Sequence, residues 1–170
     1  RILLSKPMSY TGITGIYIPY TGEANVNVNI RDFMLPATTT HEMAHQRGFA
    51  REDEANYIAY LACTANDDPQ FKYSGVMLAL IYSMNALADV DFEAYKDLVG
   101  KYSPGMRRDL IDNNEFWAQY EGKVEKISNS INNTYLKTNG QKDGVQSYGR
   151  MVDLLLAEYR SKEKDRVVEE

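Results

Sequence analysis

The stretch TTTHEMAHQRGFAREDEAN, residues 38–56, carries the signals for two helices joined by a tight turn. Pro36 and the threonines that follow favour a helix start, and Gly48 is a residue type that often follows the last turn of a helix. A second helix is expected from about Arg51 to Asn66, because acidic residues in a first turn suit the positive end of the helix dipole. Since few residues separate the helices, the chain must reverse at Gly48, as a residue with positive φ allows.

The segment before this stretch predicts a small β element. Apolar and polar residues nearly alternate in ITGIYI (13–18) and in VNVNI (26–30), which indicates two short strands forming a hairpin or ribbon. In the second strand the valines and Ile30 are expected on one face, and Asn27 and Asn29 on a solvent-facing side. The expected fold is therefore mainly α (α+β), a helical domain with a small N-terminal β hairpin or ribbon beside the motif helix, an arrangement that the motif residues below make zincin-like by resemblance.

The segment after the stretch predicts further helices within one domain. A core helix is expected over about 70–88, a short segment at 91–102, one or two helices over 104–137 and a last helix over 145–160. The domain then divides into a β element (1–35), a metal-binding helix pair (36–66), a helical subdomain (67–160) and a fraying charged tail (161–170).

Composition excludes some classes of function. A net charge of -5 and basic residues scattered along the chain argue against nucleic-acid binding. Cys63 is the only cysteine and lies in an apolar helical stretch, where a buried, unreactive thiol is expected. The apolar run Tyr73–Leu87 is shorter than the roughly 20 residues of a membrane span, and a core helix is expected there.

Both histidines of the chain lie on the first motif helix. Four residues separate His41 from His45, so both lie on one face and can direct an imidazole nitrogen at one point. Zinc at about 2.0–2.1 Å from each nitrogen fits this spacing. Glu42 follows His41 directly, where a general base can take a proton from a water that the metal activates. HEMAH therefore predicts two zinc ligands and a catalytic base.

A third ligand is needed, because a catalytic zinc keeps three protein ligands and one open position. The chain has no other histidine and Cys63 is expected to be buried, which leaves a carboxylate. The metzincin pattern HExxHxxGxxH matches through Gly48, but Arg51 stands where its third histidine belongs. That pattern is therefore excluded.

The HExxH motif and the EDEAN segment together resemble the gluzincin class of zinc metallopeptidases. The resemblance implies a third ligand from a glutamate on the next helix, with Asp or Asn four residues later, which matches Glu52 and Asn56. Helical phase then places Asn56 beneath Glu52, where it can hold the free nitrogen of a ligand histidine, His41 being favoured. Glu54 remains the alternative ligand, because only six residues separate His45 from Glu52.

A closer resemblance is carried by HEMAHQRGFAREDEANYIAYLA, with GIYIPYTGEANVN before it and GVQSYGRMVDLLLA near the end. These segments look like a family of uncharacterised bacterial proteins in which such a domain follows several transmembrane helices. The resemblance implies an extracytoplasmic domain at the bacterial cell membrane, anchored only through segments outside this chain. It implies no particular substrate.

Two supporting features are predicted around the metal. Tyr148 and Arg150, at the expected start of the last helix, are candidate donors to the oxyanion that develops in peptide hydrolysis. The strand ANVNVNI (24–30) can bind an extended peptide along its edge, or can pair internally.

These patterns favour a zinc-dependent peptidase acting on a peptide or protein substrate. Zinc is held by His41, His45 and Glu52, and Glu42 is the base and then the proton shuttle. The alternatives are a non-catalytic zinc-binding sensor or interaction domain, whose site a fourth ligand such as Glu54 closes, and a purely structural helical domain. The sequence indicates no oligomeric state.

Overall fold

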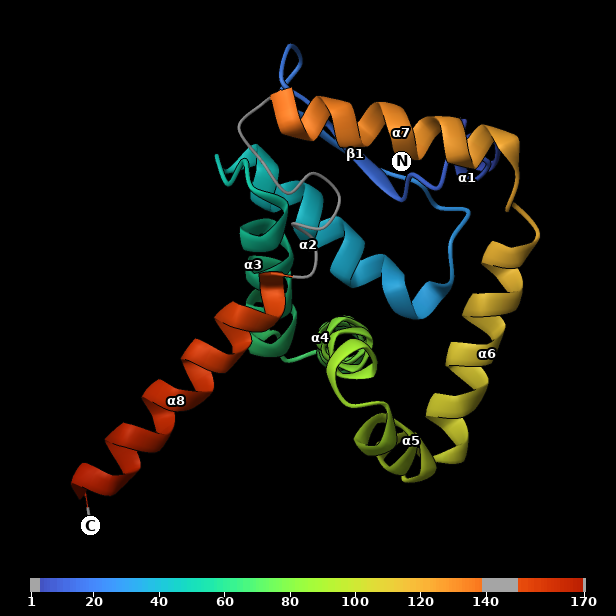
Figure 1. Ribbon diagram of the computed structural model, residues 1–170. Helices are drawn as coiled ribbons and strands as arrows, with labels where there is room; N and C mark the ends of the chain where they lie inside the picture. The colour runs from blue at the N-terminus through green and yellow to red at the C-terminus, as the bar shows by residue number, and fades with distance from the viewer. Residues whose placement is uncertain (1–3, 139–149, 170) are drawn as a thin grey trace.

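The computed structural model describes residues 4–138 and 150–169, which form a mainly helical fold with one small antiparallel hairpin near the N-terminus (Figure 1). This confirms the fold class expected from the sequence. The described elements are α1 (Ser5–Ser9), β1 (Gly15–Ile18), β2 (Glu23–Val26), the 3-10 helix η1 (Asp32–Met34), α2 (Leu35–Gln46), α3 (Glu52–Ala65), α4 (Pro69–Val90), α5 (Phe92–Gly100), α6 (Pro104–Ala118), α7 (Lys123–Thr138) and α8 (Met151–Glu169).

The two motif helices form as predicted, and the turn between them depends on Gly48. Its φ is +100°, a conformation that side chains disfavour. The N–H of Gly48 donates to the carbonyl of His45, and the N–H of Phe49 donates to that of Ala44. These two bonds form a Schellman motif, which satisfies carbonyls at the end of α2 and turns the chain back into α3.

The hairpin lies against α2, and its second strand differs from the prediction. β1 pairs with β2 in the register Gly15 to Val26, so the second strand ends where the predicted one begins. The predicted solvent-facing side of 26–30 is also wrong, because Asn27 is 0% exposed. Its amide donates to the hydroxyl of Ser9 and the carbonyl of Ile13, contacts that a solvent-facing strand would not make.

The core lies where α2, α3, α4 and α8 meet. Its buried cluster consists of Ala37, Ala59, Cys63, Leu78 and Met151. Cys63 is completely buried, as predicted, and burial raises the pKa of its thiol, which suits a structural residue.

Close approach between α3 and α4 requires a glycine. A Cβ at Gly75 would lie 2.6 Å from the Cβ of Cys63, so only a residue without a side chain fits there. Ser74, next to it, is fully buried and accepts a hydrogen bond from the N–H of Ala37 in the first turn of α2. Helix α4 therefore fixes the start of the motif helix.

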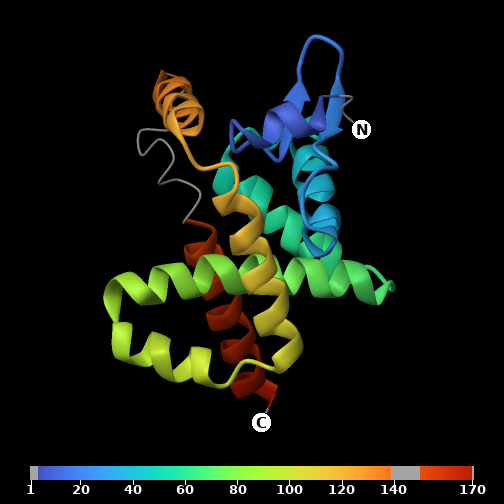
Figure 2. The same cartoon turned by 90° about the vertical axis from the view of Figure 1, so that its right-hand side faces the viewer.

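Helix α4 is longer than the apolar run that predicted it. Its 22 residues are long and apolar enough to cross a membrane by length and composition, with a mean hydropathy of 1.2. It also contacts α2, α3, α5 and α8, and Figure 2 shows it running across the middle of the molecule. These contacts are those of the expected core helix.

Polar side chains add to the packing of α6 and α8 against the rest of the fold. Tyr73 of α4 donates to Asp109 of α6 at 2.5 Å, and Tyr57 of α3 donates to Glu158 of α8 at 3.2 Å. The predicted helical region 104–137 forms two helices, α6 and α7.

The predicted fraying tail at 161–170 is wrong for its described part, because α8 continues to Glu169. Lys162 pairs with Glu158 one turn earlier, an arrangement that stabilises exposed helices. The predicted helix start at Val145 lies outside the described residues.

We expect Asn27→Ala to lower the free energy of unfolding by about 1–3 kcal/mol, because it leaves buried hydrogen-bonding groups without their partner. Besides its two donated bonds, the side chain accepts from the N–H of Asn29 at 2.8 Å. The measurement is urea unfolding. Asn25→Ala is the matched control, since within the described residues that amide makes an exposed bond to the carbonyl of Glu23, whose loss should cost little. Equal effects of the two substitutions would contradict the role assigned to Asn27.

Candidate metal centre

Helices α2 and α3 bring three predicted ligands together. The Nε2 atoms of His41 and His45 are 3.1 Å apart. The carboxylate of Glu52 lies 3.3 Å from Nε2 of His41 and 3.6 Å from Nε2 of His45. Each of the three side chains is 14% exposed, so the group is largely but not completely shielded from solvent. The three form a possible metal-binding triad.

These separations fit a tetrahedral zinc ion. Ligand atoms at about 2.0–2.1 Å from zinc in tetrahedral geometry lie about 3.3 Å from one another. The two Nε2 atoms, 3.1 Å apart, and Oε2 of Glu52, 3.3 Å from Nε2 of His41, lie close to that separation, and the other carboxylate oxygen, Oε1, lies 3.6 Å from Nε2 of His45. Two imidazoles and one carboxylate are also a donor set of known catalytic zinc sites.

The turn after α2 orients His45. Its Nδ1 lies 2.7 Å from the carbonyl oxygen of Phe49, which can only accept, so Nδ1 carries the proton and donates. Nε2 then keeps its lone pair for a metal. Burial by itself lowers the pKa of His45, but Glu52, the Phe49 carbonyl and the charge of Glu42 together outweigh burial, and the pKa is raised. The Gly48 turn thus selects the tautomer of a ligand.

The electrostatics of Glu52 favour an ionised ligand. Burial alone would raise its pKa, but hydrogen bonds and charge from His41 and His45 lower it to about 2. Glu52 therefore remains a carboxylate at neutral pH, the form in which it can bind a metal ion.

Glu54 does not lie with the triad. Its side chain is 45% exposed and pairs with Arg51, with Nε of the arginine 3.5 Å from a carboxylate oxygen. Two residues along a helix turn the side chain by about 200°, so Glu54 faces away when Glu52 faces inward. Of the two glutamates, the structure brings only Glu52 to the histidines.

Glu42 is buried beside the triad and beneath the hairpin. It is 4% exposed, and its side chain lies against Gly15 of β1. Burial raises its pKa, the neighbouring histidines lower it, Glu52 raises it, and the net direction is upward. A carboxylate whose pKa is raised toward neutral pH is suited to act as a general base.

Asn56 is buried behind Glu52 but does not make the predicted bond to His41. Its amide nitrogen donates to the hydroxyl of Tyr82 at 3.3 Å. Nδ1 of His41 is buried, and it has no hydrogen-bond partner among the described residues. The prediction relied on helical phase alone to aim Asn56 at the histidine, whereas its amide nitrogen is bonded to Tyr82 on α4.

The predicted oxyanion donors stay predictions. Tyr148 lies outside the described residues. Arg150 is exposed and lies directly before α8.

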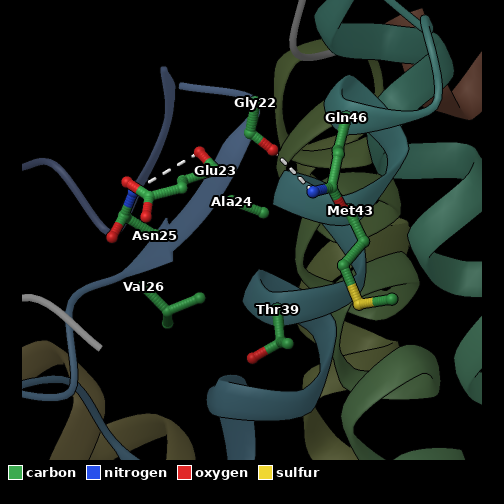
Figure 3. Close-up of a pocket in the computed structure, with 8 residues that line it drawn as sticks. All are labelled: Gly22, Glu23, Ala24, Asn25, Val26, Thr39, Met43 and Gln46. Atoms are coloured by element: carbon green, nitrogen blue, oxygen red, sulfur yellow. Dashed lines mark hydrogen bonds between the residues drawn. The ribbon is translucent and has the colours of Figure 1, made fainter. Parts of the chain in front are cut away.

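A hollow of about 530 Å³ separates β2 from α2. Figure 3 shows that Ala24 and Val26 of β2 lie on one side, and that Gln46 of α2 donates to the carbonyl of Gly22 at 2.6 Å across one end. Its other lining residues are Glu23, Asn25, Thr39 and Met43.

The position of the hollow on α2 indicates which strand of the hairpin lies nearer the triad. Residues advance by about 100° along a helix, so Glu42 lies between the side of α2 that lines the hollow and the side that carries His41 and His45. Since β2 lines the hollow and β1 lies on Glu42, β1 is the strand nearer the triad.

Sequence reasoning missed three contributors to the site. The role of the Phe49 carbonyl could not be predicted, because every residue has a main-chain carbonyl. The turn expected at Gly48 did indicate where this carbonyl would lie. Tyr82 was one of 13 tyrosines with nothing to distinguish it. Gly15 had a usable signal, since a glycine inside a strand often marks a close approach.

Comparison with known proteins gives one match. A family model described as "Protein of unknown function (DUF3810)" matches residues 1–156. No curated protein and no solved structure matches the chain.

We expect Glu52→Gln to weaken zinc binding by more than about 100-fold, since even the loss of an outer partner of a ligand costs 10–100-fold. Glu54→Gln is the matched control on the same helix and should bind zinc as the wild type does. Zinc affinity is measured by competition with a chromophoric chelator. Equal weakening by the two substitutions, or none by either, would contradict the assignment of Glu52.

Proposed function

The chain belongs to the DUF3810 family of proteins of unknown function, and we propose that it is a zinc-dependent metallopeptidase of the gluzincin type. The observation that carries the proposal is the arrangement of His41, His45 and Glu52 within 3.6 Å of one another, with Glu42 buried at their side. Three ligands and an adjacent carboxylate are what metal-assisted hydrolysis requires.

In this proposal each residue of the group has one task. Zinc, when bound, activates water and polarises the scissile carbonyl. Glu42 takes the proton from the attacking water and delivers it to the amine that leaves. The Phe49 carbonyl keeps His45 in the tautomer that presents Nε2.

The hairpin supports a peptide as the class of substrate. The N–H of Asn27 donates to the carbonyl of Thr14, so the main-chain groups of Gly15 and Tyr17 point away from β2 in the alternation of an antiparallel pair. An extended peptide can pair with this edge of β1, which lies nearer the triad than β2 does. The edge proposed for peptide binding is therefore that of β1, in place of the predicted strand 24–30.

The alternative, a non-catalytic zinc-binding sensor, requires a fourth protein ligand that closes the site. Glu54, the residue expected in that role, points to solvent and pairs with Arg51. Its position favours the peptidase over the sensor.

For the location of the domain we propose the outer side of a bacterial cell membrane, with attachment through segments outside this chain. The proposal rests on the resemblance of the motif segments to membrane-anchored bacterial proteins. In this arrangement α4 remains a core helix, because α2, α3, α5 and α8 all contact it.

We expect Glu42→Gln to reduce peptide cleavage by about 10²–10⁴-fold, the usual contribution of a general base, while zinc content and fold are retained. Cleavage is measured on a broad peptide library by mass spectrometry, with zinc quantified in the same samples. Glu54→Gln is the control carboxylate and should cleave as the wild type does. A zinc-loaded wild type that cleaves nothing in the library would contradict the proposal.

A further inference from the structure

Gly15 lies in close contact with the side chain of Glu42. A Cβ at position 15 would be 2.4 Å from Oε1, 2.5 Å from Cγ and 2.6 Å from Cδ of that glutamate. Ordinary van der Waals contact begins at about 3.4 Å. Because three atoms of the side chain are too close, rotating the carboxylate alone would not relieve the clash, and the whole end of Glu42 would have to move.

The backbone does not explain the glycine at position 15. Gly22 and Gly48 have positive φ and no atom within 4 Å of a built Cβ, so backbone conformation accounts for both of them. The φ of Gly15 lies outside that region, and another residue could adopt it. A glycine inside a strand costs stability, and it often marks a site where another group approaches closely. At position 15 the approaching group is Glu42.

Glu42 has little room to move elsewhere. It is 4% exposed, and its pKa responds to His41, His45 and Glu52, which places it within electrostatic reach of all three. β1 bounds it on the opposite side. A methyl group at position 15 would therefore push the carboxylate toward the triad or into another rotamer.

We propose that Gly15 is a positioning residue, whose missing side chain sets where the Glu42 carboxylate lies between β1 and the three ligands. Its catalytic meaning rests on the proposed peptidase function, in which Glu42 is the base. Misplacement of a reacting group by about 1 Å can cost roughly 100-fold in rate. Gly15 acts through Glu42, so its substitution changes the rate and leaves the metal ligands in place.

The kinetic test compares Gly15→Ala with the wild type, both loaded with zinc. We expect kcat to fall about 100-fold, with KM and zinc affinity close to the wild-type values. Gly105→Ala is the matched control, because its Cβ would meet nothing closer than Ser103 Oγ at 3.9 Å, and its kcat should be unchanged. An unchanged kcat in Gly15→Ala, or a loss explained by lost zinc, would overturn the positioning role.

A second test measures the contact without using activity. Gly15→Ala is introduced into the wild type, into Glu42→Gln, which keeps the shape of the side chain, and into Glu42→Ala, which removes the clashing atoms. We expect the urea midpoint to fall in the first two backgrounds and to change little in the third. An equal fall in all three would overturn the proposal, whatever the activity.

The two tests separate this proposal from the function on which it rests. Coupling between positions 15 and 42, together with the loss of kcat, supports both. If positions 15 and 42 are coupled but the wild type cleaves no peptide, the peptidase function and the positioning role are both refuted. The contact between Gly15 and Glu42 is then a packing contact only. If the wild type cleaves peptide but positions 15 and 42 are not coupled, the proposed peptidase function stands and the role of Gly15 is refuted.

Discussion

The site depends on the reversal of the chain at Gly48. Positive φ at this residue lets two hydrogen bonds close α2 and directs α3 back along it. The same turn places the Phe49 carbonyl on Nδ1 of His45 and brings Glu52 to the two histidines. One backbone conformation therefore sets both the spacing of the ligands and the tautomer of one of them. A side chain at position 48 would act on all of these at once.

The environment around the ligands gives neighbouring carboxylates different roles. Glu52 is held by two imidazoles and stays ionised, with its pKa lowered to about 2. Glu42 lies beneath β1, and burial raises its pKa. Glu54 is exposed beside Arg51. The proposed metal ligand Glu52, the proposed base Glu42 and the ion-paired Glu54 thus differ in their surroundings, although all three are glutamates within 13 positions of one another.

The local part of this arrangement could be predicted from the sequence. The spacing of His41 and His45, the glycine after α2 and the phase that separates Glu52 from Glu54 are all properties of one or two helical turns. The residues around the motif therefore sufficed to predict the helix pair and the possible metal-binding triad of His41, His45 and Glu52. The bounds of α2 and α3 also lie within a few residues of the expected ones.

The features that the sequence did not predict depend on contacts between segments that are far apart in the chain. The buried amide of Asn27 donates to Ser9 and Ile13. The alternation of apolar and polar residues in 26–30 therefore did not come from a strand with one solvent-facing side. Asn56 bonds Tyr82, from a helix that the motif does not contain. The close contact of Gly15 with Glu42 likewise could not be predicted, because it forms only when β1 packs against α2.

The central claim is a zinc site with three protein ligands and an open position. The most direct measurement is an anomalous difference map, recorded at the zinc edge from crystals of the zinc-loaded protein. We expect one strong peak bonded to Nε2 of His41, Nε2 of His45 and the carboxylate of Glu52, with a solvent molecule as the fourth ligand. A fourth protein ligand at that peak, or no peak at these three residues, would contradict it.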